Sequence, residues 1–355
     1  MTNGFRAGEH MIGLWDTTGN AVVKALAAER RTAGGVTSGL ALTLIVVADE
    51  VQVRDAEAAA TIAASMHPCR LLIVVRDEVT HERSRLDAEV VVGGRLGPCE
   101  AVVMRMRGRL ALHAESVVMP LLAPDVPVVT WWRCPPPERI AYDPLGVVAE
   151  RRITDATQSD DPTAALRTRA EDYAPGDTDL AWTRITPWRT LVAGVFDTGP
   201  AVPTRITISA AEKDPSAALL GGWLTTRLGV TAELQPVQGS SLRGVSMTLS
   251  DGGTVDITRH DGTARVVRTG LPERTLPLTD RPVGEELAEE LRRLDPDQSY
   301  AAALSAATNV ELSGRNPTRV HVWNDPALAE RPDTADAEGT DPGAIVHATA
   351  PASQQ

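Results

Sequence analysis

The feature that most constrains the fold is a pair of uninterrupted apolar runs near the start of the chain. The first, "GLALTLIVVAD", covers residues 39–49, and the second, "RLLIVVRD", covers residues 70–77. Neither run alternates with polar residues, as a half-exposed strand would, so both predict strands of a parallel sheet buried on two faces. The segment between them, "RDAEAAATIAASM", is rich in alanine and predicts a helix. This order of strand, helix and strand predicts an open α/β sheet covered by helices.

Further segments extend this N-terminal α/β domain over residues 12–150, after a short extension at 1–11. A helix is expected over about residues 18–31, and the segments "DAEVVVGG", "EAVVMRMRG" and "VPVVTWW" supply three more strand candidates. The alternation of strands and helices predicts a mainly parallel sheet. Residues 151–180 are mostly polar and contain Pro162 and Pro175, which predicts a connector with some helix.

Residues 181–312 predict a second, α+β domain. In "DPSAALLGGWLTTRLG", Asp214 can cap a helix that Gly229 ends. Downstream, "GVSMTLSDGGTVDITRHDGTARVVRTG" alternates apolar and polar residues, with Asp251-Gly252 and Asp261-Gly262 at the two reversals. Such dipeptides favour tight hairpin turns, so this stretch predicts an antiparallel meander.

The chain after the meander predicts helices and then a tail. "PVGEELAEELRRL" has a leucine face, and we expect its acidic residues, Glu285, Glu286, Glu289 and Glu290, to form a solvated face. An alanine-rich helix is expected from about residue 298 to 310. Residues 331–355 are dominated by Pro, Asp, Ala, Thr and Gly, and they predict a disordered tail.

Composition excludes several classes of partner. The 355 residues include 35 Lys and Arg against 47 Asp and Glu, a net charge of -12. Binding to nucleic acid or to an anionic membrane needs clustered basic residues, so neither is expected. The first residues lack the apolar core of a signal peptide, and no run approaches the roughly 18 apolar residues of a membrane span, which predicts a cytoplasmic protein. The three cysteines, an odd number with no C-x-x-C pair, do not predict a disulfide framework.

The motif search predicts no catalytic residue, metal site or cofactor. No P-loop pattern occurs, and the glycine turn "VVGGRLG", with Gly93, Gly94 and Gly97, is followed by proline where a phosphate-binding helix would begin. His113 and Ser116 lie one helical turn apart without a third group, so they are not expected to form a nucleophilic pair. His67, before Pro68, is expected to bond a carbonyl group at the end of a helix.

The stretch "VPVVTWWRCPPPE" holds the most conspicuous side chains. The chain has seven Trp against two Phe, and tryptophan and arginine are enriched at interaction hot spots. Strand alternation sends Trp131 and Trp132 to opposite faces. Either both rings are buried in separate layers, or one faces a partner; the second alternative favours Trp132 as the exposed anchor, with Trp131 buried and Arg133 adding a contact.

Four segments in order resemble a known family. "LWDTTGNAVVKAL", "SMHPCRLLIVVRD", "HAESVVMPLLAPDVPVVTWWRCPPP" and "AALLGGWLTTRLG" are similar to segments of the actinobacterial glucose-6-phosphate dehydrogenase assembly protein family, OpcA. The resemblance runs from about residue 11 to 310. It implies a non-catalytic factor that assembles or allosterically activates glucose-6-phosphate dehydrogenase, and so supports the oxidative pentose phosphate pathway and NADPH supply.

Two alternative functions and a possible redox regulation stand beside this expectation. A sensor or enzyme could bind a sugar phosphate or nucleotide at the carboxyl edge of the N-terminal sheet, using Arg133 and the turn at Gly93 to Gly97. A structural scaffold would bind the dehydrogenase without changing its kinetics. Thioredoxin-linked control in the cyanobacterial branch would need redox-active thiols, for which the candidates are Cys69, Cys99 and Cys134.

Overall fold

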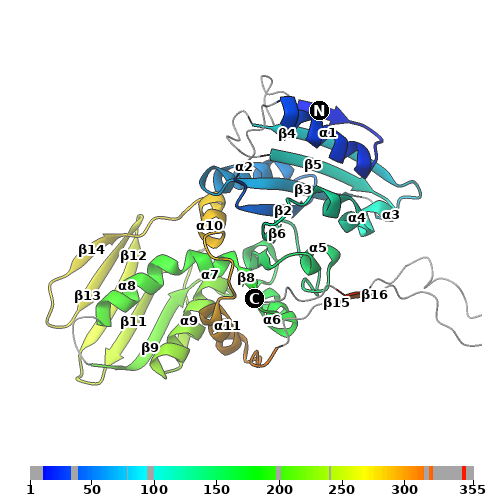
Figure 1. The fold of residues 1–355 in the computed structure, drawn as a ribbon. Helices are drawn as coiled ribbons and strands as arrows, with labels where there is room; N and C mark the ends of the chain where they lie inside the picture. Colours follow the sequence, from blue (N-terminus) through cyan, green and yellow to red (C-terminus); the bar gives the residue numbers. More distant parts are fainter. Residues whose placement is uncertain are drawn as a thin grey trace, which may run out of the picture.

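The long apolar runs form the centre of an eight-stranded sheet in the computed structural model (Figure 1). The structure describes residues 11–32, 39–77, 79–93, 100–196, 201–239 and 241–315, and the backbone of 320–322 and 346–348. The strand order is β1-β4-β5-β3-β2-β6-β7-β8, and only the β1–β4 and β4–β5 pairs are antiparallel. The strands are β1 (Met11–Leu14), β2 (Leu42–Ala48), β3 (Cys69–Asp77), β4 (Arg85–Val92), β5 (Glu100–Arg107), β6 (Val128–Trp132), β7 (Arg151–Thr154) and β8 (Asp177–Asp179).

Helices cover both faces of this first sheet, as its uninterrupted apolar strands require. One face packs against α1, α3, α4 and α5, and the other packs against α2 and α10. Every residue of β2 is buried. The covering helices are α1 (Gly19–Thr32), α2 (Val53–Met66), α3 (Arg109–Leu112), α4 (Ala114–Val118), α5 (Pro144–Val147) and α10 (Val283–Glu290).

The segment expected to be a connector is instead part of the first sheet. Residues 151–180 contain β7, the short helix η3 (Ala156–Gln158), α6 (Pro162–Asp172) and β8. The two strands are short and carry Arg, Asp and Thr, so no apolar run marks them in the sequence. Their polar side chains are buried because they bond to one another and to later helices, which the sequence pattern does not reveal.

The second sheet has six strands and confirms the predicted antiparallel meander. Its order is β10-β9-β11-β12-β13-β14, and only β10–β9 is parallel. Gly252 has φ 82°, and Asp261 and Gly262 have φ 43° and 76°, as tight reversals between β strands require. The strands are β9 (Pro203–Ala210), β10 (Ala232–Pro236), β11 (Gly244–Leu249), β12 (Thr254–His260), β13 (Thr263–Arg268) and β14 (Arg274–Pro277).

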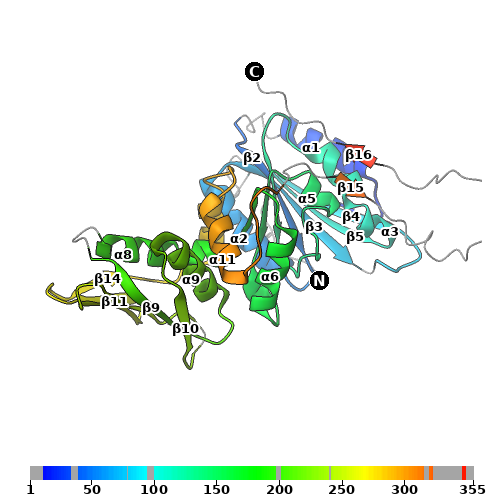
Figure 2. The same ribbon diagram turned by 90° about the horizontal axis from the view of Figure 1, so that it is seen from below.

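The described helices that pack on the second sheet lie on one side of it. Helices α8 and α9 lie on the same side of it in both views (Figures 1 and 2), and buried residues of both, with others from α11, share its core. Asp214 caps α9 by accepting hydrogen bonds from the backbone N–H groups of Ser216 and Ala217, and Gly229 ends the helix in the left-handed region, as expected. The helices are α7 (Leu180–Arg184), α8 (Thr186–Phe196), α9 (Pro215–Leu228) and α11 (Gln298–Thr308).

Helix α10 follows the second sheet in the chain but packs on the first. Leu287 and Ala288 belong to the core beneath α2. At Gly284 the helices approach so closely that an added Cβ would lie 2.7 Å from the Cβ of Ile62. His67 Nε2 lies 2.8 Å from the carbonyl oxygen of Ala288, so this histidine bonds a carbonyl of α10. The range 181–312, expected to be a separate domain, therefore contributes a helix to the first core.

The predicted end segments fall mostly outside the described residues. Residues 1–10 lie outside them, and Met11 begins β1. Most of the expected tail at 331–355 also lies outside. Within that range, β16 (Val346–Ala348) pairs with β15 (Val320–Val322) in an antiparallel ladder.

Candidate functional site

The paired tryptophans of β6 are both buried, and the expectation that Trp132 faces outward is wrong. Trp131 is 0% exposed and packs in the core that α2 and α10 cover. Trp132 is 1% exposed and packs in the core on the other face of the sheet. Because both faces are covered, strand alternation sends each ring into a different core. The alternative with both rings buried in separate layers describes this strand.

Arg133 and the glycine turn lie at opposite edges of the first sheet. Arg133 follows β6, and its backbone N–H donates to Val47 near the carboxyl end of β2. Gly93 follows β4, whose last residue pairs with Glu100 at the start of β5, so Gly93 lies at the amino edge of the parallel strands. The prediction of a sugar-phosphate or nucleotide site that combines Arg133 with this turn is therefore wrong. Gly94 and Gly97 lie outside the described residues.

The strand order reverses between β2 and β6. Open α/β sheets bind their ligands at the carboxyl ends of the strands at such a position. β2 pairs with β3 on one side and with β6 on the other. Dinucleotide-binding sheets have a glycine-rich turn after the corresponding strand. Here the residues that connect β2 to α2 are Asp49, Glu50, Val51 and Gln52, with two carboxylates and no glycine. This turn is unsuited to the close approach of a pyrophosphate.

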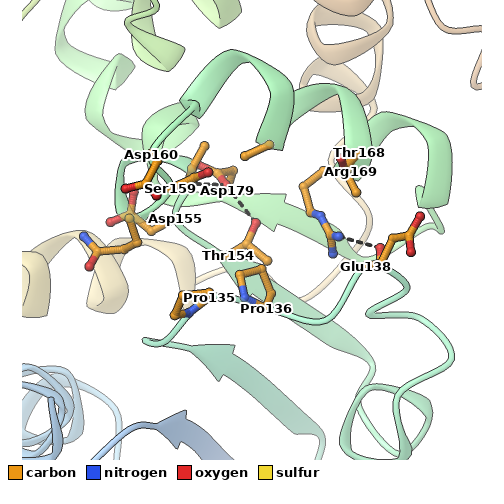
Figure 3. Close-up of a pocket in the computed structure, with 13 residues that line it drawn as sticks. Pro135, Pro136, Glu138, Thr154, Asp155, Ser159, Asp160, Thr168, Arg169 and Asp179 are labelled. Atoms are coloured by element: carbon orange, nitrogen blue, oxygen red, sulfur yellow. Dashed lines mark hydrogen bonds between the residues drawn. The ribbon is translucent and has the colours of Figure 1, made fainter. Parts of the chain in front are cut away.

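A cavity of about 520 Å³ lies beside this position, at the carboxyl ends of β6, β7 and β8 (Figure 3). The chain after β6 forms one wall, the turn after β7 and the end of β8 form the floor, and α6 forms the opposite wall. Its volume is that of a small-molecule site. Lining residues include Pro135, Pro136, Asp155, Thr168, Arg169 and Asp179.

Two buried carboxylates in the floor of the cavity form hydrogen bonds with other groups of the protein. Asp179 accepts hydrogen bonds from the hydroxyl of Thr154 at 2.7 Å and from the backbone N–H groups of Ala156 and Ala181, both at 2.9 Å (Figure 3). Burial, together with the nearby Asp155, raises the pKa of Asp179. Burial acts on Asp155 in the same sense, but its hydrogen bonds with Arg184 outweigh this and lower its pKa. These acids fix the geometry of the floor.

Arg169 holds the wall that follows the tryptophans. Its guanidinium is buried, and Nη2 donates to the carbonyl oxygens of Pro137, at 2.9 Å, and Glu138 (Figure 3). Burial lowers the pKa of Arg169. Its Nη1 atom is enclosed and has no hydrogen-bond partner among the described residues. The triple proline is thus fixed to α6, a helix of the segment expected to be a connector.

A buried ion pair joins β7 to the end of α10. Arg151 pairs with Glu290, and its Nη1 donates to the carbonyl oxygen of Asp295 at 2.9 Å. Glu290 also accepts hydrogen bonds from the hydroxyls of Thr178 and Thr183, both at 2.7 Å. All its oxygens are therefore bonded, which offsets the cost of burying the charge.

A second ion-pair cluster connects the cavity to α10. Arg184 of α7 bonds to Asp155 at 2.7 Å and to Glu286 at 2.8 Å. Glu286 and Glu290 are 4% and 7% exposed, so the expectation of a solvated acidic face on this helix is wrong for both. Glu286 and Glu290 are four residues apart and each directly precedes a core leucine, which is the sequence signal that could have predicted their burial. Nothing nearby in the sequence identifies the arginines with which they form ion pairs.

The thiols and histidines of the described residues do not form a reactive group. Cys69 and Cys134 are both buried, and burial raises the pKa of Cys134 to about 11. Cys99 lies outside the described residues. The hydroxyl of Ser116 donates to the backbone oxygen of His113 and does not pair with its imidazole. Among the described residues no group of His, Cys, Asp and Glu could hold a metal ion, and no helix could cross a membrane.

Both halves of the chain match one protein family. Residues 60–171 match the domain described as glucose-6-phosphate dehydrogenase subunit N-terminal domain, and residues 175–304 match the C-terminal domain with the same description. The chain belongs to the OpcA family. The two matches are adjacent, follow the domain order of the family and together cover more than half of the chain, which confirms the resemblance found in the sequence.

Cyanobacterial OpcA proteins are similar over part of their length. The OxPP cycle protein OpcA of Synechococcus elongatus is 28% identical over 226 residues, which cover 59% of this chain and 47% of that protein. The protein of the same name from Nostoc punctiforme is 25% identical over 230 residues, 60% of this chain and 44% of that protein. The chain thus matches these curated relatives over about half of their length.

Solved structures give weaker similarity. A biliverdin reductase from Synechocystis aligns with a TM-score of 0.40 and 10% identity over 76% of this chain and 97% of its own. An oxidoreductase from Sinorhizobium meliloti aligns with a TM-score of 0.41 and 12% identity over 76% and 95%. Similarity at this level carries no functional inference for this OpcA chain.

Proposed function

We propose that this OpcA chain is a non-catalytic subunit that binds glucose-6-phosphate dehydrogenase and activates it allosterically. The observation that carries the proposal is that both halves match domains described as a subunit of that enzyme. Through this activation the chain supports the oxidative pentose phosphate pathway and NADPH supply. The net charge of -12 agrees with a protein partner and with no role on nucleic acid.

The carboxyl edge of the first sheet supports a non-catalytic role. The turn after β2 carries Asp49 and Glu50 where a dinucleotide-binding enzyme needs glycines and close backbone approach. The carboxylates that line the cavity floor, Asp155 and Asp179, are bonded to Arg184 and to backbone and side-chain donors of the chain itself. Neither is left free for proton transfer.

Activation follows from a shift between two states of the dehydrogenase. An activator that binds both states equally changes nothing, however tightly it binds. A hundredfold preference for the state with higher substrate affinity corresponds to about 2.7 kcal/mol. We expect this preference to come from differential contacts of a preformed surface, since the ion pairs of Arg151 and Arg184 hold α10, which follows the second sheet in the chain, to β7 and α7.

Arg133 and the chain that follows it form the proposed contact region at this edge. Burial of Trp131 and Trp132 leaves Arg133, which is partly exposed, as the member of the expected trio with access to a partner. Arg133→Ala is expected to weaken the complex by a few-fold while the chain stays folded, because a partly exposed cation contributes modestly to an interface.

Co-purification tests the proposal. The tagged chain and the dehydrogenase of the same organism are mixed and resolved by size-exclusion chromatography with light scattering, with an unrelated dehydrogenase of similar size as the control. We expect a complex with the cognate enzyme alone. Separate elution of the chain and the cognate dehydrogenase at concentrations of about 10 μM would contradict the proposed function.

The cavity favours a second candidate function, a sensor of a sugar phosphate or nucleotide. Its volume of about 520 Å³ suits a small molecule, and it lies at the carboxyl ends of parallel strands. Calorimetry of the isolated chain with glucose 6-phosphate, NADP and NADPH separates the two functions. Micromolar binding supports the sensor, and absence of heat supports the purely protein-binding subunit.

A further inference from the structure

The second sheet has one face that no described helix covers (Figures 1 and 2). Strand alternation and the registers of the six strands decide which side chains lie there, since their neighbours, such as Ile208 and Ile257, enter the core. We call this surface the open face. Its side chains are Arg205, Thr207, Ser209, Glu233, Gln235, Ser246, Thr248, Thr254, Asp256, Thr258, His260, Thr263, Arg265, Val267, Thr275 and Pro277.

The open face is nearly neutral in a strongly acidic chain. It carries two arginines, Arg205 and Arg265, and two acids, Glu233 and Asp256, with Glu273 at its rim. Glu273 forms two hydrogen bonds of 2.7 Å with Arg265. These charges sum to minus one, against -12 for the whole chain. Most other side chains of the face are threonine or serine, so the charge that keeps two copies apart lies elsewhere on the molecule.

The open face is large enough for a specific interface. A strand residue covers roughly 3.3 Å along the strand and 4.8 Å across it, or about 16 Å². Six strands of four to eight residues then present about 600 Å² of sheet surface. Two such faces packed together bury about 1,200 Å², the lower limit of standard protein interfaces.

We propose that two copies of this chain associate through their open faces. A second copy presents the same nearly neutral surface, so contact there avoids the like-charge repulsion that other faces of a chain with charge -12 would bring. Two sheets related by a two-fold axis form an isologous contact, which closes without leaving a further binding face. The small contact area predicts a dimer with a dissociation constant of about 1–100 μM.

Sedimentation velocity of the isolated chain from about 1 to 200 μM tests this inference, since it spans the expected dissociation constant. We expect a monomer–dimer equilibrium that strengthens as NaCl rises from about 0.05 to 0.5 M, because salt screens the net repulsion of the two acidic chains. A monomer throughout this concentration range would overturn the proposal.

Paired variants localise the contact. Thr248→Glu with Thr258→Glu adds two negative charges to the open face, and each lies beside an arginine of the neighbouring strand, Arg205 or Arg265, which protects the fold. We expect dimerisation to weaken at least tenfold. Thr190→Glu with Ala193→Glu, at exposed positions on α8 on the covered side of the sheet, adds the same charge as a matched control and should leave the dimer unchanged.

Two further outcomes would overturn the assignment. A dimer that the double variant does not weaken would place the contact on another surface. A chain that stays monomeric, but whose double variant loses binding to the dehydrogenase, would give the open face to that partner and not to a second copy. Circular dichroism of each variant confirms that its fold is intact before either result is interpreted.

Discussion

The two sheets of this OpcA chain differ in what their strands present to either side. The first sheet is covered on both faces, so β2 is buried at every position and β6 places one tryptophan in each core. In the second sheet the described helices cover one face, and strands such as β11 and β12 alternate buried apolar residues with exposed serine and threonine. A substitution in β2 or β6 of the first sheet therefore disturbs packing at every position, whereas in the second sheet its effect depends on the parity of the position.

The first sheet itself has two halves with different chemistry. β2 and β3 are mostly apolar, with ion pairs from Arg70 and Arg76 near the two ends of β3, whereas β7 and β8 are held by buried ion pairs such as Arg151 with Glu290 and Arg152 with Asp177. The polar half forms the cavity and receives α10 from the second part of the chain. A buried ion pair gives less net stabilisation than apolar packing, but loss of one partner leaves an uncompensated buried charge. The stability of this half therefore depends on residues distant in sequence.

The largest expected effect tests the double covering of β6. Trp131→Ala and Trp132→Ala should each lower the free energy of unfolding by about 3–5 kcal/mol, because each ring leaves a cavity in a closed core. Urea unfolding followed by circular dichroism measures both. A loss below about 1 kcal/mol for Trp132→Ala would mean that its side of the sheet is open.

The polar half should show a loss that a second substitution repairs. Glu290→Leu leaves Arg151 buried without a counter-charge, and we expect a loss of about 3 kcal/mol. Replacing Arg151 with Met in the same chain removes that uncompensated charge and should restore at least half of the loss. Equal stability of the single and double variants would show that the pair does not hold β7 to α10.

Close packing of α10 on α2 predicts a smaller loss. Gly284→Ala places a Cβ 2.7 Å from the Cβ of Ile62 and 2.8 Å from the carbonyl oxygen of Ala59, so the helices must separate. The expected cost is about 1–3 kcal/mol. Gly194→Ala on α8, where nothing lies within 4 Å of the added atom, is the control and should be neutral or slightly stabilising.

The stability of the first sheet is expected to depend on pH through Glu57 of α2. Burial, with Glu89 nearby, raises the pKa of Glu57 on α2 from 4.5 to about 7. The folded state therefore holds a proton that the unfolded state has released between these values, so stability falls as pH rises from about 4.5 through 7. Glu57→Gln should remove about 1–2 kcal/mol of this penalty at pH 8 and change little at pH 4. Unfolding midpoints at the two pH values give the comparison; a gain of equal size at both would exclude titration as its cause.

The smallest effect belongs to the open face. Thr248→Ala should change the free energy of unfolding by no more than about 0.5 kcal/mol when measured at low protein concentration, since its side chain is exposed. Met247→Ala, at the next residue on the same strand, should cost about 2–3 kcal/mol. Similar losses at both positions would show that the two faces of β11 are equally covered.

The sequence predicted the elements whose determinants are local. The apolar runs identified β2 and β3, Asp214 identified the start of α9, and Asp251-Gly252 identified a reversal of the meander. It missed elements that depend on distant partners. β7 and β8 lack an apolar run, because they are stabilised by residues more than 100 positions away, as Thr178 and Glu290 show.

The candidate site was predicted in part. Its location at the carboxyl edge after the paired tryptophans was expected, and the strands that end there do form the floor of a cavity. The exposure of Trp132 could not be decided from alternation, since alternation states that two faces differ and not whether either is open. The role of Arg169 was invisible, because its partners are backbone carbonyls of Pro137 and Glu138 in another segment.

The activity of the dehydrogenase itself tests the proposed function most directly. Initial rates of the cognate glucose-6-phosphate dehydrogenase are measured at subsaturating glucose 6-phosphate while this OpcA chain is added from zero to about 20 μM, with the chain alone as the control. We predict a saturable rise in rate, at least severalfold, and no NADP reduction by the chain alone. A rate that stays constant while co-elution shows the complex formed would contradict activation, and NADP reduction by the chain alone would contradict a non-catalytic subunit.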